Sequence, residues 1–257
     1  MAFTQVQWSS KVLGKQVGMN VILPDTGTPP FPVFYLLHGL SDDYTIWHRR
    51  TRIEWYVRDL PLIVVMPDGY RGFYTNHEEG PAYATYMAEE LPAFVERHFA
   101  AVSGRAGRCV GGLSMGGYGA LRLALGYPER YLAATSHSGA LGFGHEPVGE
   151  SDFRAVEFRR IAGPQPAGSQ HDLFELAARA QAAGTLPALR LDCGVDDHLL
   201  RHNRLFVEHL RALGIAHEYA EFPGNHNWDY WDLHVQEALV FHCRQLALPA
   251  NGVSPIR

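Results

Sequence analysis

One serine in this chain stands between two glycines in a pattern that can make it a nucleophile. The segment Gly112-x-Ser114-x-Gly116 matches the turn in which a serine directly follows a strand and opens a helix. That turn strains the serine backbone, and glycine at the flanking positions removes side chains that would clash. Residues 108–111 can form a buried strand, and residues 118–125 have helical spacing. This context favours a catalytic serine over a flexible glycine-rich loop.

A serine hydroxyl needs a base to take its proton and an acid to orient that base. After a serine on such a turn, the acid comes first along the chain and the histidine second. The acid is expected after a strand at 189–193, and we predict Asp197, because the third residue beyond Gly194 can turn back toward the serine. Asp196 is the alternative, and either aspartate can instead cap the following helix.

The base is predicted to be His226, one of 14 histidines in the chain. Three features single it out: it lies on a loop, it follows the last expected strand at 217–222, and it comes after the acid. A Pro-Gly turn at 223–224 leads into this loop, so the imidazole can reach the serine. Most of the other histidines are expected to be structural or solvated.

Two backbone N–H groups should stabilise the negative oxygen that forms during acyl transfer. One is expected from Met115, the residue after the serine. The other is expected from Leu40, in the turn that follows a buried strand at 33–38, where Gly39 lets the backbone approach closely. His38 precedes that glycine and is expected to shape the turn through a structural hydrogen bond, without reacting itself.

Five aromatic side chains can line a substrate pocket or belong to the core: Trp47, Tyr74, Tyr118, Phe143 and Trp228. We predict Trp47, Tyr118 and Trp228 as substrate-binding residues, and Trp47 and Trp228 are favoured because they adjoin the loops of the site. His198 and His202 form an i, i+4 pair that can bind zinc on a helix face. No further ligand falls at matching spacing, so a solvated helix face is preferred and no metal site is predicted.

The order of elements predicts an α/β fold. Strands that alternate with helices need crossover connections, which produce a mostly parallel sheet covered on both faces. Two antiparallel strands are expected near the N-terminus. Residues 141–187 break the rhythm with many glycines and prolines, and they are interpreted as a small cap-like insertion at the carboxyl edge of the sheet. Residues 1–257 are therefore predicted to form a single domain.

The bulk composition narrows the class of protein. A chain of 257 residues with 46% hydrophobic and 19% charged residues is globular and can bury a large core. The net charge is −5 and there is no basic run, so neither a nucleic-acid nor a membrane partner is expected. The first residues do not match a signal peptide, and three widely spaced cysteines favour a reduced, cytoplasmic protein. The sequence allows a homo-oligomer without specifying one.

With these pieces in place, the chain resembles the putative-esterase family of α/β-hydrolases. That family includes esterase D (S-formylglutathione hydrolase), tributyrin esterases, feruloyl esterase domains and mycolyltransferases. The resemblance spans nearly the whole chain and rests on six segments: Tyr35-Leu-Leu-His-Gly39, Val64-Val-Met-Pro-Asp-Gly69, Glu89-Glu-Leu-Pro92, Gly111-Gly-Leu-Ser-Met-Gly-Gly-Tyr-Gly-Ala120, Cys193-Gly-Val-Asp-Asp197 and Pro223-Gly-Asn-His-Asn-Trp228.

The resemblance implies an α/β-hydrolase fold with a sheet of about eight strands, and it places the triad on Ser114, Asp197 and His226. It also implies a small-molecule ester substrate and neither a metal nor an organic cofactor. Segments 42–47 and 72–76 are most similar to the tributyrin-esterase branch, which acts on short-chain acyl esters. The predicted function is therefore a serine carboxylesterase that acts through an acyl-enzyme on Ser114. The alternatives are an S-formylglutathione hydrolase-type thioesterase and a carbohydrate acetyl or feruloyl esterase.

Overall fold

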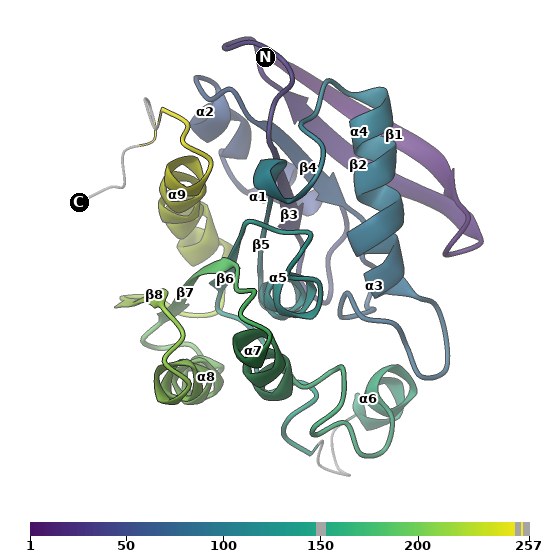
Figure 1. Cartoon of the computed structure of the whole chain (residues 1–257), viewed down its shortest axis with the longest axis vertical. Helices are drawn as coiled ribbons and strands as arrows, with labels where there is room; N and C mark the ends of the chain where they lie inside the picture. Colours follow the sequence, from purple (N-terminus) through teal and green to yellow (C-terminus); the bar gives the residue numbers. More distant parts are fainter. Residues whose placement is uncertain (148–152, 250–252, 254–257) are drawn as a thin grey trace.

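The fold is built on one twisted sheet, seen in a computed structural model that describes residues 1–147, 153–249 and 253 (Figure 1). The sheet has eight strands in the order β1-β2-β4-β3-β5-β6-β7-β8, in which β2 runs antiparallel to its neighbours β1 and β4 and the other neighbouring pairs are parallel. The strands are β1 (Ala2–Ser10), β2 (Lys15–Leu23), β3 (Val33–Leu37), β4 (Ile63–Pro67), β5 (Arg108–Leu113), β6 (Ala133–His137), β7 (Ala188–Gly194) and β8 (His217–Phe222). This is the predicted α/β-hydrolase architecture.

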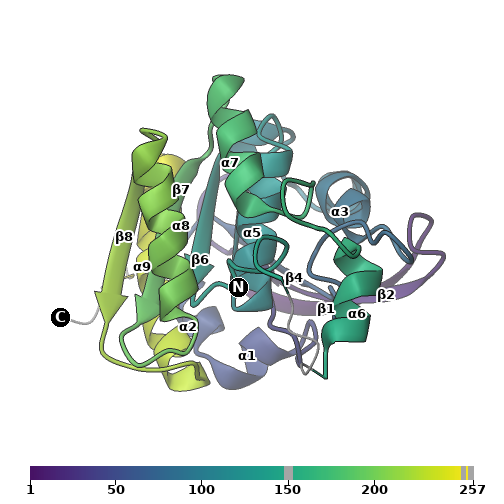
Figure 2. The ribbon, with the colours of Figure 1, turned by 90° about the horizontal axis from the view of Figure 1, so that it is seen from below.

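Helices cover both faces of the sheet. They are α1 (Ile46–Arg50), α2 (Ile53–Val57), α3 (Tyr83–Thr85), the π-helical turn η1 (Tyr86–Glu90), α4 (Leu91–His98), the 3₁₀ turn η2 (Arg105–Gly107), α5 (Met115–Gly126), α6 (Ala155–Ala162), α7 (Leu173–Ala182), α8 (Leu200–Ala212) and α9 (Trp228–Gln245). Helices α5, α7 and α8 lie side by side on one face, and α2 and α9 pack together on the other (Figure 2).

Alternation of side chains along the central strands creates two separate cores. In β3, Val33, Tyr35 and Leu37 join the core beneath α5, whereas Phe34 and Leu36 join the core beneath α9. Both sets are buried because a parallel strand under helices on both faces has no solvent side. The near-continuous apolar run of this strand follows directly from that position.

The stretch between β4 and β5 forms a helix with one irregular turn. Its helical spacing is broken at η1, a π-helical turn that passes into α4 just before Pro92. Proline has no backbone N–H to donate, so it is tolerated at the start of a helical segment. The distortion that Pro92 predicts is therefore confined to the join between η1 and α4.

The predicted insertion at 141–187 divides into two parts. Helix α7 packs against α5 and α8, so it belongs to the layer that covers the sheet. Helix α6 lies at the periphery, away from the strands (Figure 1). Residues 148–152 of this insertion lie outside the described residues.

Two further expectations concern the whole chain. Cys109, Cys193 and Cys243 are free thiols in buried positions, as their spacing predicts. Across the described residues, we find no helix with the length and hydropathy needed to span a bilayer.

A buried histidine beneath the sheet makes stability depend on pH. The side chain of His242 in α9 lies 3.0 Å from the Thr135 hydroxyl and packs on Phe34. Burial, assisted by the charges of His137 and Arg190, lowers the pKa of His242 to about 3. Between the unfolded pKa of 6.5 and that value, only the unfolded chain binds this proton, so stability falls as pH falls.

We therefore expect His242 to add a loss of up to about 1.4 kcal/mol in the free energy of unfolding per pH unit below 6.5. Urea titrations at several pH values from neutral to acid measure this slope. The variant His242→Gln should show a shallower slope, whereas His98→Gln, at an exposed position on α4, should keep that of the native chain. Equal slopes for all three proteins would contradict this origin of the acid sensitivity.

Candidate active site

The turn between β5 and α5 holds Ser114 in a strained backbone conformation, with φ 53° and ψ −115°. Such a positive φ is rare for a residue with a side chain. Two hydrogen bonds hold the turn: the Ser114 N–H donates to the carbonyl of His137 at 2.9 Å, and the Ala140 N–H donates to the Ser114 carbonyl at 3.0 Å. The loop after β6 therefore fixes the serine from one side.

The flanking glycines are required by close backbone approach. A Cβ on Gly112 would lie 2.7 Å from the backbone of Gly116, and a Cβ on Gly116 would lie 2.5 Å from the carbonyl oxygen of Leu37. Real Cβ atoms essentially never come this close to backbone. The glycine pattern thus reflects the packing of the start of α5 against the end of β3.

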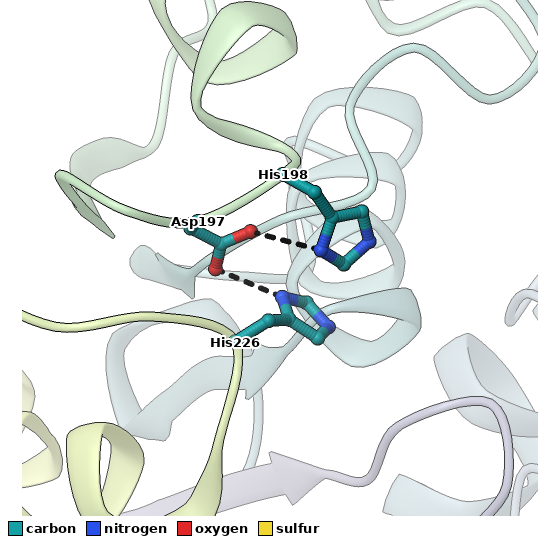
Figure 3. A group of neighbouring side chains, drawn as sticks. All are labelled: Asp197, His198 and His226. Carbon is teal, nitrogen blue, oxygen red and sulfur yellow. Dashed lines mark hydrogen bonds and ion pairs between the residues drawn. The ribbon is translucent and has the colours of Figure 1, made fainter.

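A continuous chain of hydrogen bonds joins the serine to a histidine and a carboxylate. His226 Nε2 lies 3.0 Å from Ser114 Oγ. His226 Nδ1 lies 2.8 Å from Asp197 Oδ2, and Figure 3 draws this second contact. The three side chains come from the loops after β5, β7 and β8, which all end at the carboxyl edge of the sheet. The structure therefore brings together the three residues that the sequence selects.

The two neighbouring aspartates have different environments. The Asp197 side chain is buried, and its Oδ1 accepts a hydrogen bond from the Leu199 N–H at 2.8 Å. Burial alone would raise the pKa of Asp197, but the hydrogen bonds from His226 and from Leu199 N–H outweigh it and hold the pKa below its usual range. Asp196 is exposed on the turn. Only Asp197 reaches the imidazole as a charged partner.

The turn after β3 forms the opposite side of the site. His38 Nε2 accepts a hydrogen bond from the Gly69 N–H at 2.9 Å, so its Nδ1 carries the proton and donates to the Gly39 carbonyl at 2.8 Å. The carbonyl of His38 also accepts from the Tyr74 hydroxyl at 2.9 Å. His38 is a structural residue, as predicted, and it holds the turn that carries Leu40.

These loops surround an open cavity of about 480 Å³. Its lining residues include the predicted Ser114, His226, Leu40, Met115 and Trp228. The remaining lining residues are Gly39, Ser41, Asp42, Phe73, Leu113, Ala140, Arg154, His198, Leu199, Asn227 and Trp231.

Two of the predicted substrate-binding residues lie elsewhere. Trp47 is buried, donates its indole N–H to the Leu37 carbonyl at 2.9 Å and packs edge-on against Trp228. Tyr118 is buried in α5 and donates to the His171 carbonyl at 2.7 Å. Neither belongs to the described residues that line the cavity. Both indole and phenol groups find backbone partners in the interior, which explains their burial.

Among the lining residues that the sequence did not single out for binding, four have charged or large aromatic side chains that can contact a substrate: Asp42, Phe73, Arg154 and Trp231. Asp42 is half-buried, and desolvation raises the pKa of its carboxyl above the usual range. Asp42 lies three residues after Gly39, in the turn that also carries Leu40, and this position could have identified it as a lining residue. Phe73 belongs to segment 72–76, whose similarity to the tributyrin-esterase branch was a signal. Arg154 comes from a distant part of the chain, and no local pattern marks it.

His198 also lines the cavity, where its neighbour is His226 and not His202, the partner considered from the sequence. Its ring packs against that of His226, with centroids 4.6 Å apart. His202 instead contacts Glu146 at 3.1 Å. The i, i+4 pair is therefore split between the site and the surface of α8.

The fold and the comparisons together define a serine ester hydrolase with the α/β-hydrolase fold. A model of the family described as "Putative esterase" matches residues 10–242, and the chain belongs to this family. An acetyl esterase of Caldicellulosiruptor saccharolyticus is 31% identical over 93% of this chain and 97% of its own length. Esterase Rv1288 of Mycobacterium tuberculosis is 32% identical over 86% of this chain, and the matched region covers 54% of that protein.

Solved structures agree with this assignment. The fluorophosphonate-binding serine hydrolase FphF of Staphylococcus aureus matches 95% of this chain and 98% of its own, with a TM-score of 0.84 and 28% identity. An S-formylglutathione hydrolase (FrmB) from Staphylococcus aureus has the same coverage and identity, with a TM-score of 0.81.

The close contact at the serine turn predicts a sharp difference between two glycines of α5. Gly116→Ala should lower the free energy of unfolding by about 1–3 kcal/mol and reduce ester hydrolysis, because the methyl group would push the turn away from β3. Gly126→Ala is the matched control, since its Cβ would meet nothing closer than 3.8 Å. It should be neutral or stabilising by up to about 1 kcal/mol. Urea denaturation measures both, and equal stability of the two variants would rule out this constraint.

Proposed function

We propose that this protein is a carboxylesterase of short-chain acyl esters, with Ser114 as nucleophile, His226 as general base and Asp197 as the acid that orients it. The observation that carries the proposal is the chain of hydrogen bonds from Ser114 Oγ to His226 at 3.0 Å and from His226 to Asp197 at 2.8 Å. It lies at the wall of an open cavity of about 480 Å³, so a substrate carbonyl can reach the hydroxyl.

The geometry supports two chemical half-reactions. In the first, Ser114 Oγ attacks the ester carbonyl while His226 Nε2 takes its proton, and the N–H groups of Leu40 and Met115 stabilise the oxyanion. His226 then protonates the departing alcohol. In the second, water attacks the acyl-enzyme with the same base and the same two donors. Asp197 keeps the Nδ1 proton facing itself, so that Nε2 stays free to accept.

Stacked aromatic rings at the cavity wall support the proposal that the substrate carries a short acyl group. Phe73, in the cavity wall, stacks on Phe143 with ring centroids 3.8 Å apart and meets Phe158 edge-on at 5.1 Å. A second cavity of about 410 Å³ lies behind these rings, and both Phe143 and Phe158 line it. Phe73 lines the first cavity and packs on two rings that line the second, so we expect these rings to limit how far an acyl chain extends from Ser114. The acetyl esterase among the relatives is in keeping with this limit.

A thioesterase that releases an anionic thiol is the second candidate, and one residue favours it. Arg154 lines the same cavity and brings a positive charge close to the triad. A guanidinium suits the carboxylates of a glutathione leaving group. The similarity to an S-formylglutathione hydrolase is in keeping with this reading. The free, buried cysteines also support a reducing, cytoplasmic compartment, where glutathione is abundant.

Removal of the nucleophile is the direct test of the triad. Ser114→Ala should lower kcat on p-nitrophenyl acetate by about 10⁴-fold or more, since the residual rate comes from the oxyanion donors and binding alone. Asp197→Asn should lower kcat far more than Asp196→Asn, because only Asp197 contacts His226. A Ser114→Ala variant within tenfold of the native rate would overturn the mechanism, and a reversed order of the aspartates would move the acid to Asp196.

Substrate range is tested with p-nitrophenyl esters from acetate to decanoate, together with S-formylglutathione. The native protein should show its highest kcat/KM at about two to four acyl carbons, because Phe73 limits the depth of the cavity. Phe143→Ala should move that optimum to longer chains by joining the two cavities. Phe206→Ala removes a buried ring of α8 that lines neither cavity and should leave the optimum unchanged.

An unchanged optimum in Phe143→Ala would show that the aromatic rings do not set the acyl length. A higher kcat/KM for S-formylglutathione than for any simple ester would assign the thioesterase function instead. In that case Arg154→Gln should raise KM for S-formylglutathione and leave KM for p-nitrophenyl acetate unchanged.

A further inference from the structure

His198 has no part in the proposed mechanism, yet its imidazole lies against the catalytic pair. Its Nδ1 is 3.6 Å from Asp197 Oδ1, while His226 Nδ1 is 2.8 Å from the other oxygen of the same carboxylate. Figure 3 shows the two rings turning their Nδ1 atoms toward Asp197 from neighbouring loops. One ligand atom from each of the three residues lies within 4.8 Å of the others.

Two imidazole nitrogens and one carboxylate oxygen are a ligand set that Zn²⁺ binds readily, with bonds of about 2.0–2.2 Å and a fourth position left for water. Ligand atoms on one zinc ion lie about 3.3 Å apart in tetrahedral geometry, so the His198 nitrogen must approach the other two ligand atoms, which lie within 4.8 Å of it. His198 can make this movement because its side chain is 69% exposed. The distance from Asp197 Oδ2 to His226 Nδ1, 2.8 Å, is already shorter than this separation between zinc ligands.

In the described part of the chain, the other histidine–carboxylate contacts lack a third ligand. His145 contacts Asp172 at 3.0 Å, and His202 contacts Glu146 at 3.1 Å. Among the described residues, Asp197, His198 and His226 form the one group in which three such side chains converge. Soft and borderline metal ions should therefore prefer this position over the other histidines.

We propose that Asp197, His198 and His226 form an inhibitory Zn²⁺ site that blocks the triad reversibly. This inference rests on the proposed function, because it assigns inhibition to the loss of the general base. When zinc takes the lone pair of His226 Nδ1, the ring proton moves to Nε2, the atom that must accept the proton of Ser114. The imidazole then cannot act as a base, and its hydrogen bond to Asp197 is replaced by two bonds to the metal.

The site requires His198, which distinguishes it from nonspecific binding of zinc to a catalytic histidine. With three ligands the ion is held by two loops, one after β7 and one after β8. Without His198 only the Asp197–His226 pair remains, and a two-ligand site binds a metal weakly in water. The matched control is His202, one turn further along the chain, which contacts Glu146 outside this group.

The test uses the full-length protein, treated with EDTA, dialysed and titrated with ZnCl₂ in a non-coordinating buffer. Hydrolysis of p-nitrophenyl acetate should fall with added zinc and recover with EDTA. For each protein, the measured quantity is the zinc concentration that halves its own zinc-free rate. In His198→Asn this concentration should rise by about tenfold or more, the size of loss seen when a residue that supports a metal site is removed. In His202→Asn it should stay at the native value.

Zinc binding is also measured without turnover, by calorimetry on Ser114→Ala, which keeps all three proposed ligands. One zinc ion should bind per chain, and the additional change His198→Asn should abolish that binding. Failure of the triad proposal would appear as an active Ser114→Ala protein, a result independent of the calorimetry. Equal zinc inhibition of the native protein and His198→Asn, or zinc binding that persists without His198, would overturn the metal site.

Discussion

The strained turn at Ser114 is the constraint on which the rest of the site depends. The serine backbone, at φ 53°, points the side chain out of the sheet between the end of β5 and the start of α5. This conformation persists only where α5 lies directly against the carbonyls of Leu37 and His38, and only glycine at position 116 allows that contact. The same contact brings the turn of Leu40 beside the N-terminus of α5, so one close approach positions both the proposed nucleophile and the proposed oxyanion donors.

A buried polar network anchors the proposed nucleophile Ser114 and the loop of the proposed base, His226. The carbonyl of His137 holds the Ser114 N–H, and the ring of His137 lies 2.9 Å from Asp192 Oδ1. Tyr230, in the first turn of α9, donates its hydroxyl to the same oxygen at 3.1 Å. Because α9 begins directly after the loop of His226, this bond ties the base to β6 and β7. Buried polar groups that satisfy one another in this way rigidify a site more than apolar contacts do.

The cavity lining combines aromatic and polar groups. Phe73 contributes an aromatic ring, which in the proposed function limits the length of the acyl group. Arg154 and His198 contribute a guanidinium and an imidazole to the same lining. The two residues have separate proposed roles: Arg154 would recognise a polar leaving group, and His198 would complete a zinc site.

The sequence by itself determined the order of the eight strands, the serine turn after β5 and the chain order of the proposed serine, acid and histidine, but it gave no sign of α1 and α2. These features are local, because apolar periodicity, glycine pairs and Pro-Gly turns act over a few neighbouring residues. The structural role of His38 followed from the same kind of pattern, at the glycine turn after β3.

Tertiary structure alone decided which side chains face the cavity. Packing turned Trp47 and Tyr118 into the interior, where backbone carbonyls accept their polar groups. It exposed Asp196 and buried Asp197 beside His226, although the two are adjacent in the chain. It also gathered Phe73, Arg154 and His198 from loops more than 40 residues apart. The direction of a loop side chain depends on contacts with distant segments, and a linear sequence pattern does not contain those contacts.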